Sequence, residues 1–204
     1  MKLRQFMDKL KYERELIDKG YKYICGVDEV GRGPLAGPVV CAAVIMPIDD
    51  IIDGVDDSKK LSAKKREAIA ELIEKKAVAC NICRVEPETI DEINILEATK
   101  LCMKNAVEGL SVKPDFVITD GNMTLDISIP QTSIIKGDAL SYSIGAASIA
   151  AKVYRDKLMD EYAEVYPQYG FEKHKGYGTA EHIKAIKERG LCPVHRRSFT
   201  KKWQ

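Results

Sequence analysis

An apolar run that ends in an acidic residue occurs three times in this chain, and it constrains the fold more than any other feature. Residues 23–27 lead into Asp28 and Glu29, residues 115–119 lead into Asp120, and residues 132–137 lead to Asp138. Short apolar runs rich in β-branched residues are typical of buried strands. Because ligands bind at the carboxyl ends of strands in α/β sheets, we expect these acids to meet at one edge of a sheet.

The loop that follows the first run, residues 31–38, contains three glycines and two prolines. This composition favours a fixed backbone that can approach a ligand closely. The spacing Gly31-x-Gly33-x-x-Ala36 partly fits the dinucleotide-binding fingerprint, but that fingerprint requires a helix to begin within it. Here the prolines lead into residues 39–46, a second apolar strand. Carboxylates beside exposed backbone N–H groups favour instead a site for hard cations next to a sugar or a phosphate.

Asp28 and Glu29 are neighbours, and neighbours in a regular strand face opposite sides of the sheet. We therefore expect a twist or a bulge at this point, supplied by Gly31 and the loop after it. Four carboxylates in one cluster would repel one another and shift each other's pKa values unless cations lay among them.

Charge is distributed unevenly, although the net charge of the 204 residues is only +1. Residues 170–204 hold nine Lys and Arg against three acids, so the tail is basic and the rest of the chain is acidic. Residues 166–179 combine aromatics, glycines and bases, which is typical of a loop that stacks on nucleic acid while neutralising phosphates. All three histidines lie in this tail, at 174, 182 and 195, and we expect them at the surface or on the side that faces phosphates.

The six cysteines lie mostly inside apolar runs, which is typical of a reduced, cytoplasmic protein. Cys80-x-x-Cys83 lacks the second ligand pair that zinc requires, so both are expected to be buried thiols. Neither a leader segment nor a membrane span is expected.

Capping residues and glycines predict where the helices of the chain begin and end. The pattern predicts a helix within residues 1–20 that carries Phe6 and ends at Gly20. Ser62 is placed to cap a helix to Lys76, and Asn94 with Glu97 forms a capping box. The longest helix is expected from Ser141 to about Tyr166, and Thr179 is placed to cap a helix that ends before Gly190.

The run Asp28-Glu29-Val30-Gly31-Arg32-Gly33 resembles the signature of the type 2 ribonucleases H, specifically ribonuclease HII. Residues 57–61, 90–99 and 151–156 resemble further elements of that family, so the resemblance covers most of the chain. It implies a ribonuclease H-like α/β core with a mixed five-stranded sheet flanked by helices, within residues 1–164. It also implies a helical, basic C-terminal substrate-binding region, residues 165–204.

The resemblance implies an endonuclease that hydrolyses the RNA strand of RNA·DNA hybrids and incises 5′ of single ribonucleotides in duplex DNA. Its cofactor would be Mg²⁺ or Mn²⁺, as two ions about 4 Å apart that leave 3′-hydroxyl and 5′-phosphate ends. The implied metal ligands and catalytic residues are Asp28, Glu29, Asp120 and Asp138.

Substrate contacts also follow from the resemblance. The backbone of Gly31-Arg32-Gly33 would read the ribose 2′-hydroxyl, which is the group that distinguishes RNA from DNA. Tyr177 would stack on the neighbouring deoxyribose. Lys152 is expected to contact phosphate, as are Lys59 and Lys60 in the element at 57–61. The expected partners are hybrids and ribonucleotide-containing duplexes, bound by a monomer in the cytoplasm.

Three alternatives stay open at this point. One is a module that binds hybrids without cutting them, although concentrated negative charge near phosphates would not help binding alone. The second is an enzyme like the sister family, ribonuclease HIII, which usually departs from Gly-Arg-Gly at the arginine. The third is a different metal-dependent phosphoryl-transfer enzyme, but the chain lacks the P-loop motif of nucleotide triphosphatases.

Overall fold

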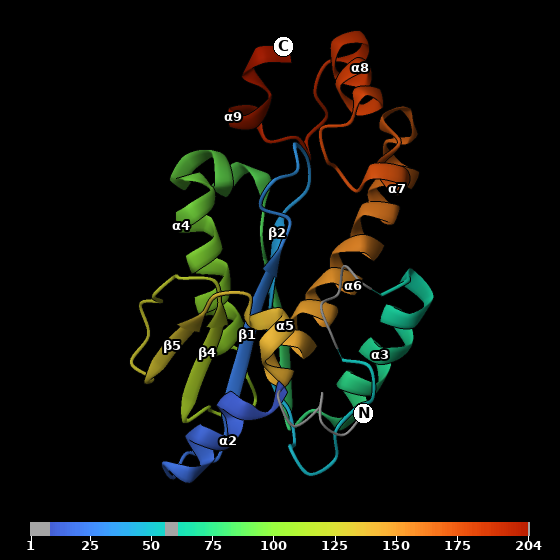
Figure 1. The fold of residues 1–204 in the computed structure, drawn as a ribbon. Coiled ribbons are helices and arrows are strands. Elements are labelled where there is room, and N and C mark those ends of the chain that lie inside the picture. Colours follow the sequence, from blue (N-terminus) through green and yellow to red (C-terminus); the bar gives the residue numbers. More distant parts are fainter. Residues whose placement is uncertain (1–8, 56–60, 204) are drawn as a thin grey trace.

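The computed structural model describes residues 9–55 and 61–203 (Figure 1). Its centre is one five-stranded sheet in the order β3-β2-β1-β4-β5. Strand β1 pairs antiparallel with β2 and parallel with β4, and β4 pairs parallel with β5. The mixed five-stranded sheet that we expected is therefore confirmed. The strands are β1 (Ile24–Val30), β2 (Val39–Ile45), β3 (Ala79–Val85), β4 (Phe116–Asp120) and β5 (Gln131–Ile134).

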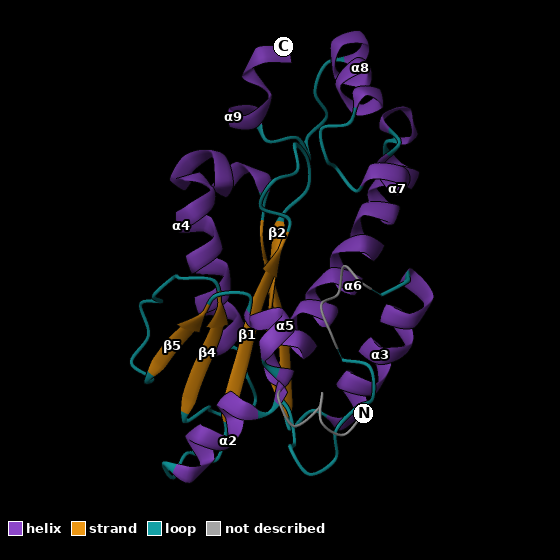
Figure 2. Cartoon of the chain, in the orientation of Figure 1, coloured by secondary structure: helices purple, strands orange, loops and turns teal. Residues whose placement is uncertain are grey.

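Helices cover both faces of this sheet (Figure 2). Helix α4 packs in one buried cluster with Cys25 and Val27 of β1 and with Cys41 of β2. Helices α3 and α6 pack in another cluster, against Val40 and Val44. The alternation of side chains along β2 therefore divides the core into two layers. The longer helices are α2 (Lys11–Asp18), α3 (Ala63–Lys76), α4 (Pro87–Glu108), α6 (Tyr142–Val165) and α8 (Ala180–Arg189).

Helix α6 crosses close to the centre of the sheet because Gly26 of β1 leaves room for it. A Cβ on Gly26 would lie 2.2 Å from the backbone carbon of Ser143, closer than real Cβ contacts allow. The Ser141 side chain caps α6 by accepting a hydrogen bond from the N–H of Ile144, as the sequence predicts. The glycine and the cap together fix where α6 starts and so where its later residues meet β1.

The C-terminal part consists of α8 and several shorter helices, and it lies beyond the end of β1 and the start of β2 (Figure 1). Thr179 caps α8 through the N–H of His182, and Gly190 ends it with a positive φ of 76°, as expected. Residues 166–179, which we expected to be a loop, are partly helical. The short elements here and before α6 are α5 (Gly137–Leu140), η2 (Pro167–Tyr169), α7 (Phe171–His174), α9 (Arg197–Thr200) and η3 (Lys201–Trp203).

Other expectations have mixed outcomes. Helix α3 follows Ser62, although the serine side chain makes no capping hydrogen bond. Asn94 accepts from the N–H groups of Leu96 and Glu97, and it starts a new helical segment at a kink inside α4.

Cys80 is exposed rather than buried, because β3 is an edge strand. Phe6, Lys59 and Lys60 lie outside the described residues. None of the described helices has the length and apolar character that spanning a membrane requires.

Candidate active site

Two parallel strands bring the first acids together at one end of the sheet. Strands β1 and β4 are in register up to the pair Val27 and Thr119, so the next residues along are Asp28 and Asp120. Residues level with each other in a parallel pair project from the same face of the sheet. The expectation that acids from separate strands meet at one edge is thus met for Asp28 and Asp120.

Asp28 is almost completely buried, with 5% of its surface exposed. Burial raises the pKa of its carboxyl well above the usual range, and the charges of Glu29 and Asp120 raise it further. A hydrogen bond from the Ser148 hydroxyl on α6 acts in the opposite direction. The Asp28 carboxylate also accepts the N–H of Glu29 at 2.7 Å. The Asp28 carboxylate is therefore held firmly in a position where its negative charge is costly.

Glu29 occupies the opposite side of β1 but still belongs to this electrostatic group. Burial raises the pKa of Glu29, the Arg32 guanidinium lowers it, and the charge of Asp120 raises it again. The Arg32 Nη1 atom lies 3.5 Å from Oε1 of Glu29. The second oxygen, Oε2, is buried and has no hydrogen-bond partner. Burying a carboxylate oxygen without a partner costs free energy, so we expect a hydrogen-bond donor or a cation beside Oε2.

The bulge that we expected between Asp28 and Glu29 is absent. The register of β1 with β2 is continuous from Cys25 and Ile45 to Val30 and Val40. The two acids therefore do face opposite sides of a regular strand. Their charges nevertheless act on the same group, because the charge of Glu29 raises the pKa of Asp28 and the charge of Asp120 raises the pKa of both.

Asp138 does not follow its strand directly. Strand β5 ends at Ile134, Lys136 adopts a left-handed conformation with φ of 60°, and Asp138 lies in the first turn of α5. The carboxylate of Asp120 accepts the backbone N–H of Gly137 at 2.6 Å. The residue before Asp138 is therefore attached to the carboxylate of Asp120, although the local structure is not the strand end that the pattern predicted.

Among the described residues, no group of three or more histidine, cysteine, aspartate or glutamate side chains is placed so that it could hold a metal ion. Asp28, Glu29 and Asp120 act on one another's charge without forming a ready-made metal site, so they are an open acidic group. Its donors are all carboxylate oxygens, the ligands that Mg²⁺ and Mn²⁺ prefer. Mg²⁺ usually keeps several waters and takes one or two carboxylates together with substrate phosphates. An open acidic edge with an unpartnered buried oxygen fits such an ion.

The glycine loop after β1 contacts the residue expected to stack on the substrate. The N–H of Leu35 donates to the carbonyl of Gly176 at 2.8 Å. A Cβ on Gly33 would lie 3.7 Å from Cε1 of Tyr177. Tyr177 is 45% exposed, so its ring is available to a ligand. The loop and Tyr177, which are more than 140 residues apart in sequence, form one surface.

Lys152 lies on α6 one turn after Ser148, the residue that contacts Asp28, and so on the same helix face. Its ammonium is already paired with Asp156 at 2.6 Å. Arg66 of α3 approaches the same Asp156 at 3.6 Å. A phosphate contact by Lys152 remains a prediction, and it would require that the ammonium leave or share Asp156.

Two predictions about the C-terminal part are wrong. Tyr169 and Phe171 are buried against Ala36 and Met159, so these aromatics build a small core instead of a stacking surface. The histidines are buried too. Nε2 of His182 lies 3.0 Å from Nε2 of His195, and Nδ1 of His182 lies 2.9 Å from the carbonyl of Tyr177. They support the Tyr177 segment from within.

Sequence reasoning missed three residues that shape this site. Ser148 was part of a small apolar helix segment, and its only signal was a hydroxyl at helical spacing from the cap. Arg155 lies in the family-like stretch 151–156 and Arg196 in the basic tail, and neither was assigned a role, but both are completely buried.

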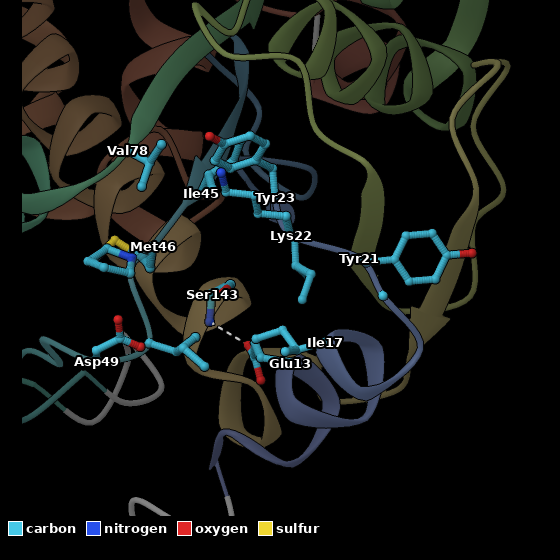
Figure 3. A pocket seen from close by; sticks show the side chains of 14 residues that line it. Glu13, Ile17, Tyr21, Lys22, Tyr23, Ile45, Met46, Asp49, Val78 and Ser143 are labelled. Carbon is cyan, nitrogen blue, oxygen red and sulfur yellow. Dashed lines mark hydrogen bonds between the residues drawn. The ribbon is translucent and has the colours of Figure 1, made fainter.

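A pocket of about 500 Å³ lies elsewhere, beside α2 and the residues where β1 begins (Figure 3). Glu13, Tyr21, Ile45 and Ser143 are among its lining residues, and Glu13 accepts the N–H of Ser143 at 2.9 Å. None of the predicted site residues lines it. The acids lie at the other end of β1, so the candidate site is an open edge of the sheet and not this pocket.

Known protein families and curated proteins show which family this chain resembles. The sequence profile of the Ribonuclease HII family matches residues 25–202. A curated Ribonuclease HII from Acholeplasma laidlawii (strain PG-8A) is 56% identical over 194 residues, which cover 95% of each chain.

Solved structures agree on the fold. The ribonuclease H2 from Pyrococcus horikoshii OT3 matches with a TM-score of 0.76 and 27% identity, over 89% of this chain and 97% of that one. Bst-RNase HIII in complex with Mn²⁺ has the same fold, with a TM-score of 0.67 at 21% identity, over 89% of this chain and 68% of that one. The higher identity is therefore to ribonuclease HII and not to its sister family. The chain belongs to the ribonuclease HII family, a family of endoribonucleases that hydrolyse phosphodiester bonds.

Proposed function

We propose that this endonuclease cuts duplex DNA on the 5′ side of a single embedded ribonucleotide and hydrolyses the RNA strand of RNA·DNA hybrids. The observation that carries the proposal is the adjacency of two features. Asp28, Glu29 and Asp120 share one edge of the sheet. The loop 31–33 follows directly and is joined to Glu29 through Arg32. A cation site and a ribose sensor are thus only a few residues apart.

The proposed ligands of Mg²⁺ or Mn²⁺ are Asp28, Glu29, Asp120 and Asp138. When bound, a pair of such ions would stabilise the attacking and the leaving oxygen of an in-line displacement. The unpartnered buried Oε2 of Glu29 and the raised pKa of Asp28 support this role, since both describe negative charge that protein groups do not neutralise. The binding of Mn²⁺ by a ribonuclease HIII of the same fold supports the same class of ion.

Substrate recognition would combine the loop and the tyrosine. The N–H groups of Arg32 and Gly33 donate no hydrogen bond to any described residue, so they are available for the ribose 2′-hydroxyl. Tyr177 would stack on the neighbouring deoxyribose. The basic residues of 165–204 would neutralise phosphates along the duplex, which makes affinity depend on salt. We propose that this region acts as the substrate-binding part of a monomer.

The test is a cleavage assay on an end-labelled DNA duplex that contains one ribonucleotide. Reactions contain Mg²⁺, Mn²⁺ or a chelator, and an all-DNA duplex of the same sequence is the control substrate. We expect a single cut 5′ of the ribonucleotide with either metal, with 3′-hydroxyl and 5′-phosphate ends. We expect no cut with chelator or in the all-DNA duplex.

Other outcomes would contradict specific parts of the proposal. If the protein bound the duplex but cut it with neither metal, it would be a non-cleaving hybrid-binding module. If the protein cut the all-DNA duplex, it would be a nuclease that does not recognise ribose. If the Asp28→Asn variant cut at the wild-type rate, the assignment of the metal ligands would be wrong. The chain would still belong to the family.

A further inference from the structure

Two completely buried arginines hold the glycine loop, and neither forms an ion pair with a described acid. Arg155 comes from α6, and Arg196 comes from the turn before α9. Burial lowers the pKa of Arg155 to about 10 and that of Arg196 to about 9. A buried charge without a counter-ion is costly, so it has to be compensated by hydrogen bonds.

The compensation comes from backbone carbonyls of the loop. Arg196 donates to the carbonyl of Gly31 at 2.5 Å and to that of Arg32 at 2.9 Å. It also donates to the carbonyl of Gly37 through two nitrogens, at 2.9 and 2.7 Å. Its own backbone N–H donates to Leu35. One guanidinium therefore spans the loop from its start to its end.

Arg155 holds a different part of the loop. It donates to the carbonyls of Pro38 and Ala36, both at 3.1 Å, and to that of Lys175 at 2.9 Å. A Cβ on Gly31 would lie 2.3 Å from Nε of Arg155, so this position has no room for a side chain. Arg155 thus fixes the base of the loop and its neighbour at 175.

The peptide groups that Arg196 holds are the ones that matter for ribose recognition. A trans peptide is planar, with its C=O and N–H pointing in opposite directions, and the described chain has no cis peptide. When Arg196 draws the carbonyls of Gly31 and Arg32 inward, the N–H groups of Arg32 and Gly33 must point outward. These are the two N–H groups that donate to no described residue.

We propose that Arg196 is a positioning residue for ribose recognition: its guanidinium aims the N–H groups of Arg32 and Gly33 at the substrate's 2′-hydroxyl. Arg196 does not touch the substrate. This inference rests on the proposed function, because it explains how the loop of that function is oriented. It predicts that loss of Arg196 reduces discrimination between ribose and deoxyribose more than it reduces affinity for duplex DNA.

The experiment measures discrimination as a ratio of two affinities. Fluorescence anisotropy gives the dissociation constants for a duplex with one ribonucleotide and for the matching all-DNA duplex, with Ca²⁺ replacing Mg²⁺ and intact strands verified on a gel. Arg196→Gln removes the charge and the fork, and Arg196→Lys keeps the charge but loses the fork. Arg197→Gln removes the same charge at the neighbouring position, which is exposed where Arg196 is buried.

We expect wild type and Arg197→Gln to share one discrimination ratio, although Arg197→Gln binds both duplexes less tightly. Both Arg196 variants should lose discrimination by roughly tenfold to a hundredfold, since a misplacement of about 1 Å can cost about that much. A merely structural role would weaken both duplexes equally and leave the ratio unchanged.

If Arg196→Gln does not fold, as judged by circular dichroism, Arg196→Lys carries the test. A folded Arg196 variant with the wild-type ratio would overturn the inference. A wild type that neither prefers the ribonucleotide duplex in binding nor cuts it selectively would instead overturn the proposed function. The two failures are therefore distinguishable.

Discussion

The Asp120 carboxylate accepts the backbone N–H of Gly137 at 2.6 Å, and this bond links the end of β4 to the turn that carries Asp138. A carboxylate bound this way is fixed in position without being neutralised. The bond therefore holds the backbone of Gly137, which precedes Asp138 in the sequence, against the acid at the end of β4.

Asp120→Asn separates the position of this side chain from its charge. The amide oxygen of Asn can still accept the N–H of Gly137, so the fold should persist. We expect single-turnover cleavage of the ribonucleotide duplex in Mg²⁺ to slow by about two orders of magnitude or more, the scale of losing one electrostatic group in an active site. Asp126→Asn is the matched control, because the Asp126 side chain is 98% exposed and pairs with Lys104 away from the site. Equal rates in Asp120→Asn and wild type would contradict the assignment.

Asp28→Asn should make the protein more stable while it removes activity. Because the folded state raises the pKa of Asp28, its stability contribution is present at low pH and is lost as pH rises through the raised value. In chelator at neutral pH, the neutral variant should therefore unfold at a higher urea concentration than wild type. The difference should disappear toward pH 4, near the usual pKa of Asp.

Mg²⁺ provides the internal control for that comparison. An ion that binds only the folded state stabilises it by an amount that grows with the logarithm of the ion concentration once that exceeds the dissociation constant. Wild type should gain stability in Mg²⁺, and Asp28→Asn should gain less. If Asp28→Asn were less stable than wild type in chelator at neutral pH, the carboxylate of Asp28 would not destabilise the folded state.

The buried histidines predict a loss of stability in mild acid. The carbonyl of Tyr177 can only accept, so Nδ1 of His182 carries a proton, and Nε2 of His182 must accept from His195. Burial lowers the pKa of both residues to about 4. Between pH 6.5 and 4 the unfolded chain therefore binds protons that the folded chain does not, and stability falls as pH falls.

His195→Gln tests this effect because it removes one of the two titrating groups. The free energy of unfolding, measured by urea titration from pH 7 to pH 4.5, should decline less steeply in the variant than in wild type. The difference between the two curves isolates the histidine effect from that of Asp28 and Glu29, whose raised pKa values act with the opposite sign. Parallel curves would mean that these rings are not held neutral.

Tyr177 should contribute to substrate affinity and little to folding. Its ring is partly exposed beside Gly33, so its removal leaves no large cavity. We expect Tyr177→Ala to weaken binding of the ribonucleotide duplex by about tenfold, within the range of one stacking contact. Tyr177→Phe keeps the ring and should bind like wild type. Similar losses in both variants would assign the effect to the hydroxyl and contradict stacking.

The features that repeat locally were predictable from the sequence. Apolar runs located the strands, and the caps at Ser141 and Thr179 located the starts of α6 and α8. Asp28 and Asp120 were predictable as one group because parallel strands share a carboxyl end. The position of Asp138 was not, since a left-handed Lys136 gives no signal in composition.

Arg155, Arg196 and the histidines show why the rest was not predictable. Charged residues are almost never fully buried unless they have partners, so a sequence favours the surface for them. Their partners here are backbone carbonyls, which every residue has and no sequence pattern marks. Only the folded chain shows that residues 31–38 supply the carbonyls for both guanidinium groups.

The central claim is that Asp28, Glu29, Asp120 and Asp138 bind divalent cations. Its most direct test is a titration of the protein with Mn²⁺ followed by electron paramagnetic resonance, in which free Mn²⁺ is counted in wild type, Asp28→Asn, Asp120→Asn and the control Asp126→Asn. We predict that wild type and Asp126→Asn remove Mn²⁺ from solution equally, and that Asp28→Asn and Asp120→Asn each bind at least one ion fewer or about tenfold more weakly. Wild-type Mn²⁺ binding in both of these variants would contradict the claim.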